Sequence, residues 1–93
     1  MTNIATVGSV TAGNGKWGQS DLAGNVWEWN LDWYNSFAAT CNNCANFSTS
    51  SDRVSRGGSF YYNASFLPAA YRGGYFPAGR IGSGGGRCAR TAP

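Results

Sequence analysis

The sequence contains no histidine and only one lysine, Lys16, and its carboxylates number just four: Asp21, Glu28, Asp32 and Asp52. The lack of histidine excludes a Ser-His-Asp triad, a Cys-His nucleophile and a histidine zinc site. No apolar run approaches the roughly 20 residues of a membrane-spanning helix, and the first residues lack the basic and apolar regions of a signal peptide. We therefore expect few catalytic groups and no membrane partner.

Charge is scarce as well, because only 12% of the 93 residues are charged, against roughly 25% in typical domains. Glycine contributes 14 residues, and the aromatic residues comprise 4 Trp, 5 Tyr and 5 Phe. Disordered chains are poor in aromatics and rich in charge. The composition therefore predicts a single loop-rich domain over residues 1–93, with a small and mainly aromatic core.

The few charges are divided unevenly along the chain. Residues 1–46 hold one lysine against three carboxylates, a net charge of −2, whereas residues 47–93 hold six arginines against Asp52, a net charge of +5. The arginines are dispersed, so we expect no nucleic-acid partner. Arg56, Arg72 and Arg87 lie among small residues, and we expect them to bind carbonyls of irregular backbone or carboxylates of the other half.

A period of two runs from Trp27 to Trp33, where aromatic and apolar residues alternate with Glu28, Asn30 and Asp32. This pattern predicts a strand with one buried face. Further strands are expected at residues 1–12 (an N-terminal edge strand), 53–62, 69–72 and 87–91. Residues 35–52 are rich in Asn, Ser, Thr and Ala and are expected to form a surface excursion. No useful helical pattern occurs, so the prediction is a mostly irregular α+β fold with short antiparallel strands.

The pair Cys41 and Cys44 has the spacing of a redox pair, half a zinc site or a short disulfide. Zinc needs four ligands, and Cys88 is the one cysteine left. A thioredoxin-type pair lies at the start of a helix, whereas this pair lies in a polar stretch. A loop-closing disulfide is favoured, with free thiols as the alternative, and Cys88 is expected to be a small buried residue.

Four motifs in order carry a family resemblance: DLAGNVWEW at 21–29, RGGSF at 56–60, YR at 71–72 and GRCAR at 86–90. They resemble the C-terminal part of the formylglycine-generating enzyme family, also called the sulfatase-modifying-factor domain. That family has GNVWEW, RVxRGGSW and GFRCA in the same order. The resemblance implies a truncated form of its C-type-lectin-like fold.

The resemblance also implies a calcium site, formed by the carboxylates of Asp21 and Glu28 and the carbonyls of Gly24 and Val26. Calcium prefers six to eight hard oxygens, and a turn followed by extended chain can direct several of them at one point. The alternative is that Glu28 faces solvent or pairs with an arginine.

The enzymes of this family oxidise a sulfatase cysteine to formylglycine with two cysteines that bind copper, a few residues after RGGSW. Tyr62 and Leu67 occupy those positions in this sequence. Neither side chain can bind copper(I), which selects soft thiolates. We therefore expect no copper and no formylglycine-generating activity.

The function predicted from these observations is a non-catalytic, calcium-stabilised lectin-like module that binds an unidentified protein or small molecule. Tyr, Asn and Ser give adaptable recognition. The candidate contact residues are Tyr61, Tyr62, Asn63, Ser65, Tyr71, Arg72 and Tyr75. One alternative is a metal-dependent hydrolase using Asp21 and Glu28. Another is a diversified ligand-binding protein of the retroelement type, which shares the fold and varies this region.

A truncated domain exposes strand edges and aromatic surface that associate readily. We therefore expect a homo-oligomer, domain-swapped forms included, and an extracytoplasmic or periplasmic parent protein.

Overall fold

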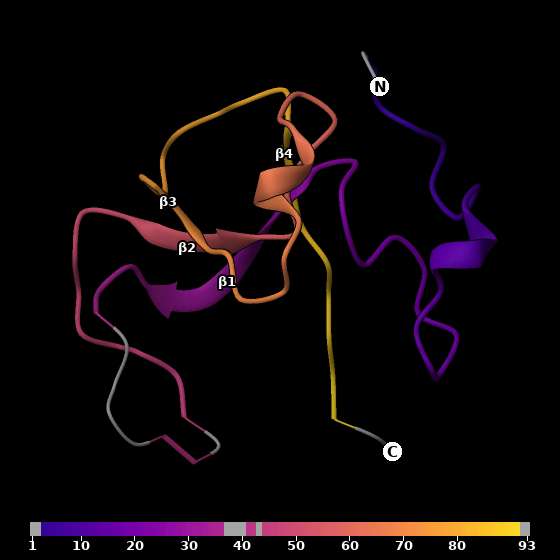
Figure 1. Cartoon of the computed structure of the whole chain (residues 1–93). Coiled ribbons are helices and arrows are strands. Elements are labelled where there is room, and N and C mark those ends of the chain that lie inside the picture. The colour runs from indigo at the N-terminus through magenta and orange to yellow at the C-terminus, as the bar shows by residue number, and fades with distance from the viewer. Residues whose placement is uncertain (1–2, 37–40, 43, 92–93) are drawn as a thin grey trace.

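A four-stranded mixed sheet forms the centre of the computed structural model, which describes residues 3–36, 41–42 and 44–91 (Figure 1). The strands are β1 (Trp27–Trp33), β2 (Arg53–Arg56), β3 (Gly73–Tyr75) and β4 (Gly84–Gly85), in the order β3-β2-β1-β4. The helices are two short 3-10 turns, η1 (Thr11–Gly13) and η2 (Ala64–Phe66). This small sheet fits the predicted α+β class, but β1 and β4 are parallel, contrary to the expected antiparallel pairing.

Strand β1 has the bounds that its period of two predicts, but the predicted buried face is wrong. Among the described residues, Trp27 and Val54 are the buried apolar side chains, at 8% and 1% exposure. Leu31 on the same strand is 62% exposed. The pairing of β2 with β1 shifts in register between Trp29 and Trp33, and β2 has only four residues. Too little structure covers the far half of β1 to bury its apolar side chains.

Glycine residues explain why the other predicted strands end earlier, or form at other positions, than the sequence predicts. β2 stops at Arg56, well before residue 62, since Gly57 and Gly58 have left-handed φ values of 95° and 70° that break a ladder. The strand expected at 69–72 forms later, as β3. At Gly74 a Cβ would lie 3.0 Å from the ring of Tyr34, so the absence of a side chain permits the close pairing.

The last expected strand, at 87–91, is also displaced. The described residues in that range form no strand, and the glycine pair of β4 joins the sheet instead. Its pairing places Gly84 beside Trp27 and Gly85 beside Glu28. A run of glycines predicts a loop, because glycine weakens strands. The sequence therefore does not predict this edge strand.

The N-terminal segment, residues 3–20, is called the arm below, and it contains no strand. The expected edge strand is replaced by a turn around Gly8, with φ 75°, and by η1. The arm is fastened to the following loop by side chains: the Ala5 N–H donates to Asn25 Oδ1 at 2.8 Å, and the Gly8 N–H donates to Asp21 Oδ2 at 2.7 Å. Figure 1 shows the arm beside the sheet rather than over it.

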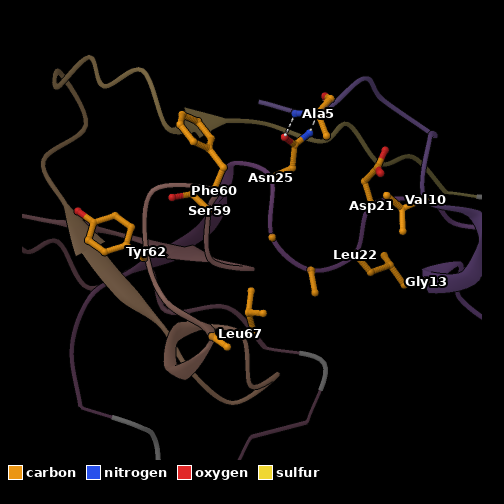
Figure 2. A pocket seen from close by; sticks show the side chains of 13 residues that line it. Ala5, Val10, Gly13, Asp21, Leu22, Asn25, Ser59, Phe60, Tyr62 and Leu67 are labelled. Carbon is orange, nitrogen blue, oxygen red and sulfur yellow. Dashed lines mark hydrogen bonds between the residues drawn. The ribbon is translucent and has the colours of Figure 1, made fainter. Parts of the chain in front are cut away.

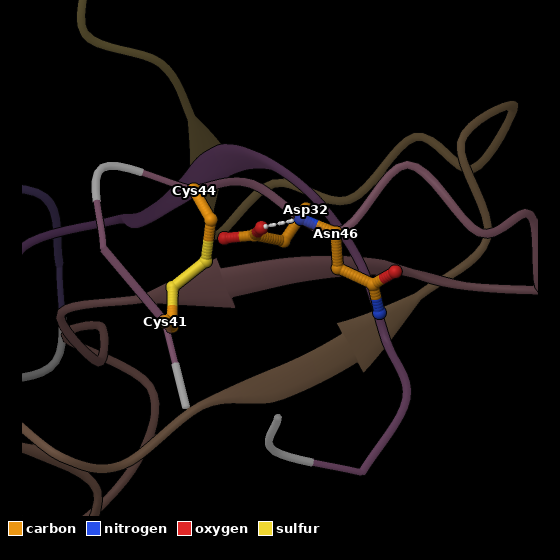
Figure 3. Close-up of a disulfide and its surroundings, with 4 residues drawn as sticks. All are labelled: Asp32, Cys41, Cys44 and Asn46. Carbon is orange, nitrogen blue, oxygen red and sulfur yellow. Dashed lines mark hydrogen bonds between the residues drawn. A yellow bond between two sulfur atoms is a disulfide. The ribbon is translucent and has the colours of Figure 1, made fainter. Parts of the chain in front are cut away.

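The excursion between β1 and β2 contains no strand or helix in its described residues. A disulfide joins Cys41 and Cys44 with a Cα separation of 5.7 Å, and the nearby Asn46 N–H donates to Asp32 Oδ1 at 2.5 Å (Figure 3). Cys88 is a free, exposed thiol, so the expectation that it is buried is wrong. None of the described helices has the length and apolar character needed to cross a membrane.

Candidate ligand-binding site

A cavity of about 380 Å³ lies between the arm, the loop of residues 21–25 and residues 59–67 (Figure 2). It is called the larger cavity below, to distinguish it from an adjoining cavity of about 230 Å³. Most of its lining side chains are apolar. The apolar lining residues are Ala5, Val10, Leu22, Ala23, Phe60, Ala64 and Leu67. Tyr62 and the polar side chains of Asp21, Asn25 and Ser59 also line the cavity. Such a lining suits an apolar group with one or two polar anchors.

The loop of residues 21–25 owes its shape to residues that tolerate left-handed backbone. Asp21 and Asn25 have φ values of 56° and 67°, which Asp and Asn adopt more readily than most residues. The Gly24 N–H donates to the Gly57 carbonyl at 2.6 Å, and the Phe60 N–H donates to the Asn25 carbonyl at 2.8 Å. These two bonds fasten one wall of the cavity to the other.

The opposite wall is built around Ser59, which is buried and accepts from the Tyr61 N–H at 3.3 Å. Asn63 caps η2, because its Oδ1 accepts from the Ser65 N–H at 3.0 Å. The turn brings Leu67 back toward Gly58, where a Cβ would lie 2.8 Å from Leu67 Cδ2. The glycine therefore permits the close packing of this wall.

Replacing Gly58 with alanine is expected to lower the free energy of unfolding by about 1–3 kcal/mol, since φ of 70° and the clash with Leu67 both oppose a Cβ. Gly82→Ala is the matched control, because a Cβ there meets nothing within 4 Å. Urea denaturation measures both variants. Equal stability of the two variants would contradict the packing described here.

The rings of Trp27, Trp29, Tyr62, Phe66, Tyr71 and Tyr75 form a surface beside the cavity, called the aromatic face below. The Trp27 ring contacts the rings of Tyr62, Phe66 and Tyr71, with centroid separations of 5.8, 6.2 and 6.0 Å. Trp29 projects to the same side of β1 as Trp27, since the two are separated by one residue of a strand. Its ring lies 6.3 Å from that of Tyr75.

Most of the predicted contact residues belong to this aromatic face or its border. Tyr61, Asn63 and Ser65 are exposed beside it on the segment that contains η2. Arg72 lies elsewhere: its guanidinium is 4.8 Å from the Tyr34 ring centroid and donates to the Asn35 carbonyl. It lines a second cavity beside the disulfide. The Arg72 guanidinium thus contacts residues that follow β1.

The four predicted calcium ligands line a smaller cavity of about 230 Å³ together with Arg87. Arg87 Nε lies 3.2 and 3.1 Å from the two carboxylate oxygens of Glu28, and Arg87 Nη2 donates to Glu28 Oε1 and to the Asp21 carbonyl, each at 2.9 Å. The hydrogen bonds that Arg87 donates to the Glu28 carboxylate raise the pKa of Arg87 above its ordinary value. A fixed positive charge therefore lies at this cavity.

Arg56 behaves as Arg87 does, with backbone carbonyls in place of a carboxylate. Its Nη1 donates to the carbonyls of Ala69 and Tyr71 at 2.9 and 3.3 Å. The prediction that Arg56, Arg72 and Arg87 bind irregular backbone or the other half's carboxylates is confirmed.

The cavity walls, the left-handed loop and the glycine step coincide with the sequence motifs that suggested a family. A comparison with protein families matches residues 2–92 to the sulfatase-modifying factor enzyme 1-like domain, the FGE-sulfatase family. The chain belongs to this family. No curated protein matches it.

The resemblance to the family's motifs aligns Tyr62 and Leu67 with its two reactive cysteines. Both side chains line the larger cavity. A phenol and an isobutyl group offer no thiolate to copper(I). The two positions that the resemblance aligns with the reactive pair therefore lie in an apolar cavity wall.

The residues around the smaller cavity meet only part of what the calcium implied by the family needs. Two carboxylates and two carbonyls supply four of the six to eight oxygens that calcium prefers, and the Glu28 carboxylate is bound by Arg87. In the described part of the chain, no group of three or more Cys, Asp or Glu side chains is arranged to hold a metal. Asp21, Gly24, Val26 and Glu28 fit calcium only if Arg87 releases Glu28, so calcium stays a prediction.

Asn25, Leu22 and Ser59 are cavity residues that sequence reasoning did not select. Asn25 belongs to the motif that identified the family, but its amide partner Ala5 is 20 residues away. Only the folded chain shows that this side chain fastens the arm.

Proposed function

We propose that this FGE-sulfatase domain is a non-catalytic, lectin-like binding module that holds an apolar group of its ligand in the larger cavity. The observation that carries the proposal is the position of Tyr62 and Leu67. They line an apolar cavity of about 380 Å³ and stand at the positions that the resemblance aligns with the family's reactive cysteines. Apolar side chains at these positions favour ligand binding over copper-dependent oxidation.

The ligand chemistry follows from the cavity walls. Val10, Leu22 and Leu67 offer aliphatic contact, while the Asn25 amide is already engaged on both its oxygen and its nitrogen by Ala5. The Asp21 carboxylate and the Ser59 hydroxyl are the polar groups that can orient a ligand. A compact aromatic or aliphatic group is therefore the best match, with the neighbouring aromatic face adding contact area.

Indole is the probe for this proposal, and methyl NMR is the measurement. Saturable shifts are expected for the methyl groups of Val10, Leu22 and Leu67, with an affinity on the order of 1 mM, because a fragment of this size gains little more than its own apolar burial. Leu67→Trp should fill the cavity and abolish the shifts of the remaining methyl groups.

Leu31→Trp is the matched control, since Leu31 is exposed on the sheet away from the cavity lining. It should leave indole binding unchanged. Shifts that do not saturate, or that persist in Leu67→Trp, would remove the proposed site.

We propose calcium as the stabilising ion of this module, held by the carboxylates of Asp21 and Glu28 and the carbonyls of Gly24 and Val26. Bound calcium would supply positive charge that ties the loop before β1 to the strand itself. The residues that favour this proposal share one cavity. Arg87 is the competitor that calcium must displace from Glu28.

The diversified retroelement type is the second candidate, and one observation favours it. The segment that follows β2 carries Tyr61, Tyr62, Asn63, Ser65 and Tyr71, all of them exposed. Tyr61, Asn63 and Ser65 lie outside the ring contacts of Trp27, so the side chains at these three positions can vary without disturbing the core. Variation confined to these positions among copies of the gene would support this candidate, whereas uniform copies would remove it.

A further inference from the structure

The chain exposes far more surface than a compact monomer of its mass. Its accessible surface is 7115 Å², whereas a compact monomer of 9.8 kDa exposes roughly 5,200 Å². The radius of gyration, 14.0 Å, likewise exceeds the value of about 12 Å for a domain of this length. The excess of about 1,900 Å² is larger than the roughly 800 Å² that each partner buries in a standard stable dimer.

The two most exposed large apolar side chains among the described residues, Val7 and Trp17, lie on the arm. None of residues 3–20 is buried, and four of its large apolar side chains are exposed: Ile4, Val7, Val10 and Trp17. Val7 and Trp17 are 82% and 78% exposed. Together with Ile4 and Val10 they put four exposed large apolar side chains on one short segment, which favours the arm as an interaction surface.

The arm is nevertheless held in a defined position. The Asn25 amide binds both backbone groups of Ala5, and Asp21 accepts from the Gly8 N–H. These are polar contacts, so they fix the backbone without covering Val7 or Trp17. A positioned backbone with outward apolar side chains has less conformational entropy to lose on association.

The charge of the arm favours a second copy as its occupant. In a two-fold symmetric interface each surface meets its own copy, so like charges repel near the axis. Lys16 is the one charged residue among residues 3–20, and its ammonium lies 5.0 Å from the Trp17 ring centroid. Pairing of two arms therefore brings together only one like-charged pair, the Lys16 of each copy.

We propose that two copies of the chain pair through their arms and bury Val7 and Trp17 of each copy. This inference does not rest on the proposed ligand binding, because neither Val7 nor Trp17 lines the larger cavity. Val7 does line the smaller cavity of the proposed calcium site, so the pairing is measured without added calcium.

Sedimentation velocity over a range of concentrations up to about 200 μM tests the pairing. The chain should form a discrete dimer, and the double variant Val7→Ser with Trp17→Ser should weaken it at least tenfold. The double variant Leu31→Ser with Phe47→Ser is the matched control, since these side chains are 62% and 69% exposed outside the arm. It should dimerise as the unaltered chain does.

Far-ultraviolet circular dichroism and urea denaturation of both double variants verify that each variant still folds. A monomer at the highest concentration would overturn the proposal. So would equal loss in the control variant, which would point to non-specific association of exposed apolar side chains.

Discussion

Trp27→Ala is expected to lower the free energy of unfolding by about 3–5 kcal/mol, close to the whole stability of a small domain. Trp27 is 8% exposed and is one of two buried apolar side chains among the described residues. Its ring contacts Tyr62, Phe66 and Tyr71. Its removal therefore takes the centre out of the aromatic cluster that the connection between β2 and β3 packs against the sheet.

Urea denaturation followed by near-ultraviolet circular dichroism measures this loss. Trp29→Ala is the control, because Trp29 lies on the same strand but is over a third exposed and contacts one ring, that of Tyr75. It should cost less than half as much. Equal losses in the two variants would mean that Trp27 is not the centre of the core.

Arg87→Gln is expected to raise the affinity for calcium at least tenfold, about 1.4 kcal/mol. The guanidinium binds both oxygens of Glu28 and the carbonyl of Asp21, so it competes with calcium for those oxygens and repels the ion. Isothermal titration with calcium measures the affinity, and thermal melts with calcium and with a chelator measure the stability that binding adds.

Arg80→Gln removes the same charge from an exposed side chain and controls for net charge. It should leave the affinity unchanged. A melting temperature that neither calcium nor chelator moves, in the unaltered chain and in Arg87→Gln, would remove calcium from the proposal while leaving the cavity. Ester turnover that chelation abolishes in the folded chain would favour the metal-dependent hydrolase over the binding module.

The sequence predicted features that depend on neighbouring residues. The bounds of β1 follow from the period of two between Trp27 and Trp33. The motifs around Gly24 and Gly57 identified the family. The contacts of Arg56 and Arg87 followed from their small neighbours and from the scarcity of carboxylates, because a guanidinium in irregular backbone needs acceptors.

Glycine accounts for most of the errors in the predicted strands. Gly57 and Gly58 end β2 by adopting left-handed backbone, whereas Gly74 and Gly84 take part in strands where neighbouring chains approach closely. Glycine as a residue type thus ends one strand and permits close pairing in two others. Which of these occurs depends on what lies beside it, and a local pattern does not contain that information.

The lack of histidine excluded histidine-based catalysis from the sequence alone. The family followed from its motifs, since they are read from neighbouring residues. The tertiary structure decided the rest: the cavity between Leu22 and Leu67, the pairing of Arg87 with Glu28 across 59 residues, and the exposure of the arm. Each joins segments far apart in the chain, and their proximity follows from the closure of long loops around a small sheet rather than from any local preference.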